Sequence, residues 1–166
     1  MLDDIRLWLE EYWEGKPAIV LNIPGLPPSV NHYLVHTRYS TYKTPAAESF
    51  QAAARLALME TYPAWKPTDL TVGVLFNFQI GPNTKFDVDN RFKVIIDSFN
   101  GLIWKDDHQV YSVFGTKSVI HPARGQKVGD IKRTYMRVFL GGSVAAMETP
   151  AKTGQISTKR QRSMTK

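Results

Sequence analysis

Acidic residues gather in one short stretch of the chain. Five aspartates fall between residues 87 and 107: Asp87, Asp89, Asp97, Asp106 and Asp107. Lys93 lies among them. Neighbouring carboxylates repel one another unless they take up protons or a cation sits between them. Hard divalent cations such as Mg²⁺ or Mn²⁺ prefer oxygen ligands, so the stretch indicates a carboxylate metal site.

A helix is expected to carry the first part of this stretch. Its apolar residues recur at helical spacing: Val88, Phe92, Ile95, Ile96 and Phe99. They predict a helix from about residue 88 to 100 with one buried face. On that helix Asp89, Lys93 and Asp97 would form a row at positions i, i+4 and i+8. Asp87 would lie at the helix entrance, where free backbone N–H groups orient a carboxylate.

The chain then turns at Asn100-Gly101 and can return Asp106 or Asp107 to the neighbourhood of Asp87 and Asp89. The sequence does not say which of the two returning aspartates faces the metal. Two or three carboxylates, with phosphate oxygens and waters, would complete the octahedron that Mg²⁺ requires.

Each part of this pattern also has a simpler explanation. Asp87 and Asp89 are common helix-capping residues, and Asp106-Asp107 suits a polar turn before a strand. Lys93 could belong to a surface ion-pair ladder. The occurrence of all these features in one local unit favours the metal site. There, Lys93 would supply a fixed positive charge where negative charge develops on a phosphate.

Charge is unevenly distributed along the rest of the chain, whose formal net charge is +6. Residues 1–14 contain five acids and one base, whereas residues 149–166 contain five bases and no acid. Basic residues beyond the acidic stretch are candidates for DNA contact: Lys117, Arg124, Lys127, Lys132 and Arg133. A basic protein with an acidic pocket is typical of metal-dependent chemistry on a nucleic acid.

Composition narrows the class of protein. A chain of 166 residues fits one domain with a real hydrophobic core. No cysteine is present, which excludes disulfides, thiol nucleophiles and thiolate zinc sites. No apolar run approaches the length of a membrane span, and the acidic N-terminus is unlike a signal peptide. We therefore expect a cytoplasmic location and no membrane partner.

The predicted fold class is α+β, a single compact domain. A mixed, mostly antiparallel sheet is expected to be packed by two core helices, with an additional N-terminal helix. Four strands are expected near residues 18–23, 70–80, 109–120 and 132–140. A second core helix over 45–61 should turn its alanine-rich face inward: Ala46, Phe50, Ala53, Ala54 and Ala57. Tyr33–Tyr42 suggests an irregular hairpin.

We expect three regions along the chain. Residues 1–16 form an N-terminal helical extension, 17–141 the main domain, and 142–166 a basic tail without apolar periodicity that is expected to be disordered.

The chain resembles the RusA family of Holliday junction resolvases, which are small homodimeric endodeoxyribonucleases often found in phages and prophages. The resemblance covers about residues 20–140. It starts at Pro27-Pro28-Ser29-Val30-Asn31 and continues at Tyr42-Lys43-Thr44-Pro45. It is most specific at Asp87-Val88-Asp89-Asn90 with Lys93, and at the segment from Trp104 to Val110.

The resemblance implies that Asp87, Asp89 and Asp107 are catalytic and bind the metal, that Asp106 can share the site, and that Lys93 is an essential partner. It also implies Mg²⁺ as the cofactor with Mn²⁺ as a substitute, no small-molecule cofactor, a homodimer, four-way DNA junctions as substrate, and a bacterial or phage origin.

Three functions are compatible with these features of the sequence. The leading one is paired phosphodiester hydrolysis of Holliday junctions and related branched DNA. The alternative is a DNA-structure-binding protein of the same fold without catalysis, which the intact acidic residues and Lys93 argue against. A phosphohydrolase for small esters is less compatible with the basic flanks and the lack of a Gly-rich phosphate loop.

Overall fold

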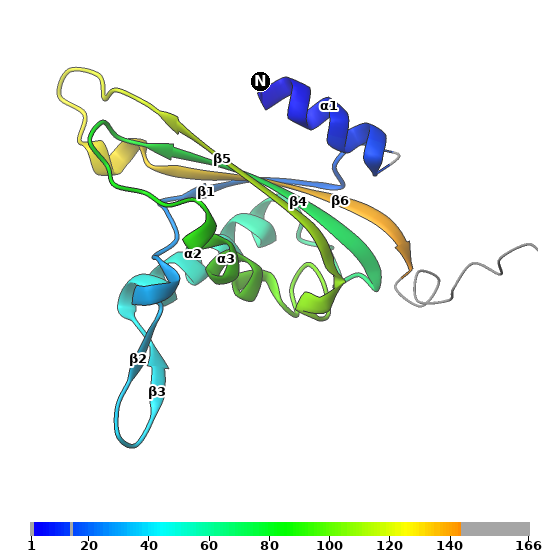
Figure 1. Cartoon of the computed structure of the whole chain (residues 1–166), viewed down its shortest axis with the longest axis horizontal. Coiled ribbons are helices and arrows are strands. Elements are labelled where there is room, and N and C mark those ends of the chain that lie inside the picture. Colours follow the sequence, from blue (N-terminus) through cyan, green and yellow to red (C-terminus); the bar gives the residue numbers. More distant parts are fainter. Residues whose placement is uncertain (1, 14, 144–166) are drawn as a thin grey trace, which may run out of the picture.

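A four-stranded mixed sheet forms the centre of the protein (Figure 1). The computed structural model describes residues 2–13 and 15–143, with side chains in 7–13 and 15–141. The strands are β1 (Ile19–Pro24), β4 (Leu70–Ile80), β5 (Val110–Val119) and β6 (Arg133–Ser143). Their order is β1-β6-β4-β5, with β4 and β5 parallel and the other pairs antiparallel. The predicted α+β class with a mostly antiparallel sheet is confirmed.

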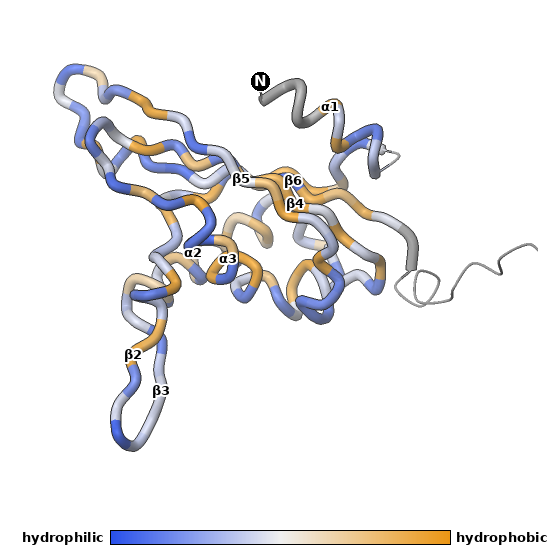
Figure 2. The backbone as a smooth tube through the Cα atoms, viewed as in Figure 1, coloured by the Kyte–Doolittle hydropathy of each residue, from blue (hydrophilic) through white to orange (hydrophobic). Residues whose placement is uncertain are grey.

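Helices cover both faces of this sheet (Figure 1). Alternate residues of β4, including Val74, Phe76 and Phe78, join the large core under α2 (Pro45–Thr61) and α3 (Phe92–Phe99). Leu75, on the opposite face, packs with residues from the end of α1 (Leu2–Tyr12). Because β4 is buried on both faces and flanked by two strands, it contributes more residues to the large core than any other element. Figure 2 shows apolar residues gathered where the strands cross the helices.

The start of α2 follows from its sequence. Thr44 accepts a hydrogen bond at its hydroxyl from the Ala47 backbone N–H at 3.4 Å, and Pro45 occupies the first turn. The buried face was predicted slightly wrongly, because Ala47 is buried and Ala46 is exposed. Adjacent alanines have the same hydropathy, so composition alone could not fix the rotation of the helix.

The N-terminal helix is attached by Trp13, which follows α1. Its indole lies over Gly73 and Gly141 so closely that a methyl group at either glycine would overlap the ring. Trp13 Nε1 donates to the Ser112 hydroxyl at 3.2 Å. Two glycines on adjacent strands therefore make the space that holds α1 against the sheet.

A two-stranded hairpin, β2 (Leu34–His36) with β3 (Thr41–Lys43), projects from the body (Figure 1). Short 3-10 helices join the remaining elements: η1 (Val30–His32), η2 (Asp89–Arg91), η3 (Asp107–Gln109) and η4 (Val128–Ile131). Among the described residues, no helix combines the length and the apolar character needed to cross a bilayer.

The division of the chain into an extension, a main domain and a basic tail stays a prediction. Strand β6 ends at Ser143, and residues 144–166 of the expected tail lie outside the described residues.

The Trp13 contact leads to a stability prediction. Gly73→Ala should destabilise the fold by about 1–3 kcal/mol, because the added methyl group meets the indole in the middle of a central strand. Gly129→Ala is the matched control, since a methyl group there meets no atom within 4 Å. Urea unfolding of both variants measures the difference. Equal stability of the two would contradict the tight seating of Trp13.

Candidate active site

The acidic turn that precedes α3 is pressed against the sheet by its apolar residues. Val88 and Phe92 lie over Gly115 of β5, and a methyl group at Gly115 would overlap both side chains. Phe86 is buried against Phe78, with ring centroids 4.9 Å apart. Asp87 and Asp89, which alternate with these residues, are exposed. The turn therefore directs both carboxylates outward.

The helix expected over 88–100 is wrong in its first turn. Residues Asp89–Arg91 form the separate 3-10 helix η2, and α3 begins only at Phe92. Arg91, with φ −111° and ψ −21°, departs from regular helical geometry at the junction. The expected i, i+4, i+8 row is consequently interrupted, with Lys93 and Asp97 on α3 and Asp89 outside it.

Lys93 and Asp97 form an ion pair on α3, with Nζ 3.1 Å from Oδ1. The lysine side chain is 63% exposed and the aspartate 22%. The hydrogen bond and the negative charge of Asp97 raise the pKa of Lys93, and the charge of Asp107 adds to this. Lys93 therefore stays a cation at neutral pH. It interacts both with Asp97 on α3 and, through its charge, with Asp107 in the segment before β5.

Asp106 and Asp107 have different surroundings. Asp106 caps η3, accepting at Oδ1 from the His108 backbone N–H at 3.1 Å and lying 2.8 Å from His108 Nδ1. These hydrogen bonds lower the pKa of Asp106. Asp107 is exposed and influences Lys93 electrostatically. Of this pair, Asp107 is the residue whose charge contributes to the raised pKa of Lys93.

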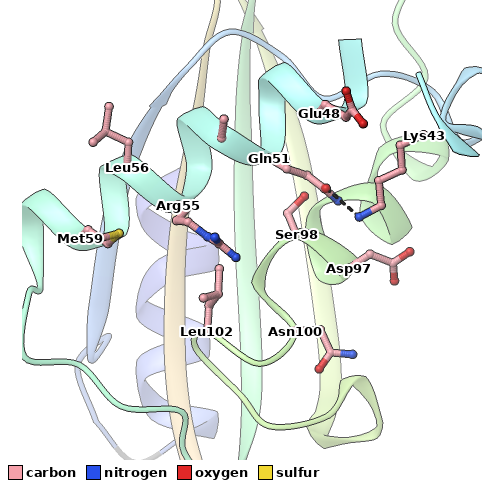
Figure 3. Close-up of a pocket in the computed structure, with 11 residues that line it drawn as sticks. Lys43, Glu48, Gln51, Arg55, Leu56, Met59, Asp97, Ser98, Asn100 and Leu102 are labelled. Atoms are coloured by element: carbon pink, nitrogen blue, oxygen red, sulfur yellow. Dashed lines mark hydrogen bonds between the residues drawn. The ribbon is translucent and has the colours of Figure 1, made fainter. Parts of the chain in front are cut away.

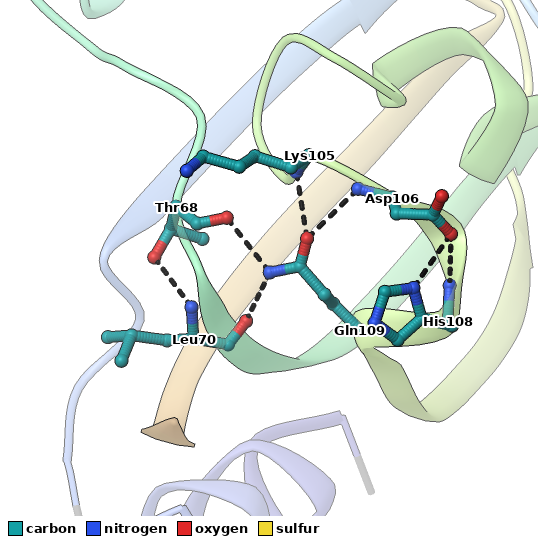
Figure 4. A network of polar contacts seen from close by, with 6 residues as sticks. All are labelled: Thr68, Leu70, Lys105, Asp106, His108 and Gln109. Atoms are coloured by element: carbon teal, nitrogen blue, oxygen red, sulfur yellow. Dashed lines mark hydrogen bonds and ion pairs between the residues drawn. The ribbon is translucent and has the colours of Figure 1, made fainter. Parts of the chain in front are cut away.

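Gln109, for which the sequence suggested no separate role, fastens the segment that carries Asp107 (Figure 4). Its Oε1 accepts from the backbone N–H groups of Lys105 and Asp106, both at 2.9 Å. Its Nε2 donates to the carbonyl oxygens of Thr68 and Leu70, both at 2.8 Å. The side chain is buried, so it closes the turn before β5 and joins it to the start of β4.

Arg91 is a second residue that sequence reasoning missed. It donates from Nη1 to the Pro27 carbonyl oxygen at 2.9 Å, and its guanidinium lies 4.5 Å from the Phe86 ring centroid. Burial lowers the pKa of Arg91, while the negative charge of Asp87 opposes that shift. The Pro27-Pro28 segment is thereby tied to the acidic turn. Its position just after the Asp-x-Asp-Asn sequence was the only available signal.

The acidic residues do not form a complete metal cluster by themselves. No group of three or more His, Asp or Glu residues in the described part of the chain is close enough to hold an ion. The assignment of Asp87, Asp89 and Asp107 as joint ligands therefore stays a prediction. The donor chemistry nevertheless fits Mg²⁺, which is commonly bound by one or two carboxylates together with substrate phosphates and waters. Within the described residues, no ion pair engages Asp87, Asp89 or Asp107.

The basic residues expected to contact DNA lie near the C-terminal ends of the parallel strands β4 and β5 and in the connection from β5 to β6. Lys117 Nζ donates to the Phe86 carbonyl oxygen at 2.9 Å, next to Asp87. Arg124 and Lys127 are exposed in the connection to β6, whereas Lys132 and Arg133 are half-buried where β6 begins. Val128 in this connection packs against Gly81, the residue after β4. The basic connection thus borders the loop that leads to the acidic turn.

A groove of about 650 Å³ lies between α2 and α3, on the Asp97 side of the site (Figure 3). Its polar lining includes Lys43, Gln51, Arg55, Asp97 and Asn100. Lys43 Nζ donates to Gln51 Oε1 at 2.8 Å. The groove adds two cationic side chains next to the Lys93–Asp97 pair.

Comparison with protein families decides the assignment. The family model described as endodeoxyribonuclease RusA matches residues 24–125, more than half of the chain. The protein belongs to the RusA endodeoxyribonuclease family. It is a nuclease of the Holliday junction type, and RusA nucleases are generally metal-dependent. The matched region includes the acidic turn, Lys93 and Asp107. No curated protein matches the chain closely enough to add to this assignment.

The Gln109 contacts predict a stability effect. Gln109→Leu should lower the free energy of unfolding by at least about 2 kcal/mol, because buried backbone groups lose their partners. Gln126→Leu, which loses an exposed hydrogen bond from the Ala123 backbone N–H instead, is the control. Chemical denaturation gives both values. A Gln109→Leu protein as stable as the control would show that the turn does not depend on this side chain.

Proposed function

We propose that this RusA nuclease cleaves four-way DNA junctions with Mg²⁺, using Asp87, Asp89, Lys93 and Asp107. One observation carries the proposal. Lys93 is held at the start of α3 by Asp97, under the added influence of Asp107, while Asp87 and Asp89 are exposed beside it in sequence and free of ion pairs within the described residues. Uncompensated carboxylates next to a fixed cation suit a site that is completed by a divalent ion and a phosphate.

Asp87, Asp89 and Asp107 would hold the ion, and Asp106, whose Oδ1 is engaged by His108, can share it through its other oxygen. When bound, Mg²⁺ supplies Lewis-acid polarisation of the phosphate and a water of lowered pKa. Mn²⁺, with similar preference for oxygen ligands, is the expected substitute.

Lys93 would stabilise negative charge that develops on the scissile phosphate. Its raised pKa keeps the ammonium group charged, so it acts as a cation and not as a base. Asp97 fixes its position through the 3.1 Å hydrogen bond. Arg91 keeps the Pro27 segment and the acidic turn together.

We further propose that Lys117, Arg124, Lys127, Lys132 and Arg133 contact the phosphates of the junction arms. A homodimer with two-fold symmetry would present two sites to a four-way junction, which allows paired cuts. A bacterial or phage origin and action in the bacterial cytoplasm complete this proposal.

One observation supports the alternative function, a protein of the same fold that binds DNA structures without cutting them. The Lys93–Asp97 contact is what a simple surface ion pair on a helix would look like. Incubation with a labelled four-way junction, a flap and a linear duplex separates the two functions, since only a nuclease produces cut strands.

Metal removal gives the first functional prediction. Junction cleavage should stop in EDTA and return with added Mg²⁺ or Mn²⁺, because the carboxylates need a cation to act on a phosphate. Junction binding should persist in part, since basic residues supply much of the affinity. Gel analysis of cleavage and binding on the same samples measures both. Full cutting in chelator would exclude a metal mechanism.

Replacement of the carboxylates tests their assignment. Asp87→Asn, Asp89→Asn and Asp107→Asn should each lower single-turnover cleavage at least about a hundredfold, because the amide keeps the shape but lacks the ligand charge. Melting temperatures should stay near that of the wild type, since all three side chains are exposed. Asp69→Asn is the control, because Asp69 is an exposed aspartate that pairs with Lys105 and not with Lys93. Wild-type rates in the three variants would make these residues structural only.

Lys93 distinguishes an ion pair from a catalytic cation. The exposed pair contributes about 0.3–0.5 kcal/mol to stability, so Lys93→Ala should barely change the melting temperature. Its cleavage rate should nevertheless fall at least about a hundredfold, and Lys93→Arg should retain part of it. The wild-type rate should show no inflection from Lys93 near neutral pH, because its pKa is raised. Unchanged single-turnover cleavage by Lys93→Ala would favour the ion-pair explanation.

A further inference from the structure

The β2–β3 hairpin points away from the sheet (Figure 1), and its paired strands leave residues 37–40 as the tip. All three residues of β3 are exposed, and β2 has only Val35 partly covered. Tyr39 at the tip is 87% exposed, the highest value among the large apolar side chains described. The Arg38 guanidinium lies 5.7 Å from the Tyr39 ring centroid. An arginine and an aromatic ring are therefore presented together to solvent.

The tip has a defined conformation. Thr37 N donates to the Ser40 carbonyl oxygen at 2.8 Å, and Ser40 N donates to the Thr37 hydroxyl at 3.0 Å. His36 Nδ1 and the Thr41 hydroxyl are 2.9 Å apart across the strands. An isolated two-stranded hairpin is only marginally stable in water, so these contacts are needed to hold Arg38 and Tyr39 at the apex.

The base of the hairpin is anchored next to the candidate active site. Tyr33, immediately before β2, is 4% exposed and shares a small buried cluster with Ala47 and Val94. Its hydroxyl accepts from Gln51 Nε2 at 3.1 Å. Val94 follows Lys93 on α3. The base of the hairpin is consequently packed against the helix that carries Lys93.

Charge limits what this hairpin can bind. Residues 15–47 contain no Asp or Glu, while the hairpin carries His36, Arg38 and Lys43. An anionic partner is favoured over a basic or neutral one. An exposed tyrosine beside an arginine also suits a nucleobase, because every base offers a flat face for stacking and arginine pairs with phosphate.

We propose that Arg38 and Tyr39 form a second DNA-binding site that recognises the branch point, with the Tyr39 ring stacked on an unstacked base and Arg38 on an adjacent phosphate. Bases within a duplex are covered on both faces by their neighbours, whereas bases at a branch can expose one face. The hairpin would thus favour branched DNA over linear duplex. This inference rests on the proposed function and assigns part of its substrate selectivity to a segment outside the acidic turn.

Binding without cleavage tests the site. Affinities of the full chain are measured in EDTA by fluorescence anisotropy, for a labelled four-way junction and for a linear duplex with the same arm sequence. Tyr39→Ala should weaken junction binding about tenfold and leave duplex binding within about twofold. Tyr39→Phe should behave like the wild type, because it keeps the ring. Tyr12→Ala is the matched control, an exposed tyrosine (63%) from the helix on the opposite face of the sheet.

A second measurement reports stacking directly. With 2-aminopurine at the branch nucleotides, binding of the wild type or Tyr39→Phe should change the base fluorescence, and Tyr39→Ala should not.

Unchanged junction affinity in Tyr39→Ala would overturn the hairpin site, as would an equal loss for junction and duplex. In either case a wild-type protein that still cuts the junction would leave the proposed nuclease function standing. A wild type that neither prefers nor cuts the junction would remove both.

Discussion

The close packing of the acidic turn on β5 is the contact on which the site depends. Gly115 leaves room for Val88 and Phe92 to lie directly on the strand, and any larger residue there would push them away. Since side chains in this turn alternate, Asp87 and Asp89 must then face solvent. The same seating sets where α3 begins, and with it the position of Lys93. The packing of apolar side chains on β5, and not attraction among charged groups, therefore determines that the two carboxylates face solvent.

The charges around the site explain why its acidic residues keep negative charge that a metal ion can neutralise. Lys93 forms an ion pair with Asp97 on its own helix, and the negative charge of Asp107, from another segment, also raises its pKa. Arg91 is turned toward Pro27 and Phe86, so it cannot neutralise the exposed acids fully. The remaining negative charge would attract a divalent ion. The surrounding basic residues would attract DNA phosphates, which supply further ligands to that ion. Binding of DNA and binding of metal are expected to reinforce each other.

Much of this arrangement follows from local sequence patterns, and the failures have physical causes. The strand over 70–80 and the helix over 45–61 were predicted with their observed bounds, because their apolar patterns and the Thr44-Pro45 start are strong local signals. The helix before Phe92 was wrong because a 3-10 turn and an α-helical turn share the same composition. The role of Gln109 depends on Thr68 and Leu70, about forty residues away in sequence, so no local pattern could reveal it. Spacing likewise could not separate Asp106 from Asp107, because the distinction lies in the His108 hydrogen bonds.

The central claim is that the acidic residues form a metal site only together with DNA. Mn²⁺ binding followed by electron paramagnetic resonance tests it most directly, in a Lys93→Ala protein that keeps every carboxylate. We predict weak Mn²⁺ binding to the protein alone and at least about tenfold tighter binding to its complex with a four-way junction, with this gain lost on adding Asp89→Asn. Equally tight binding without DNA, or a gain that survives Asp89→Asn, would contradict the account.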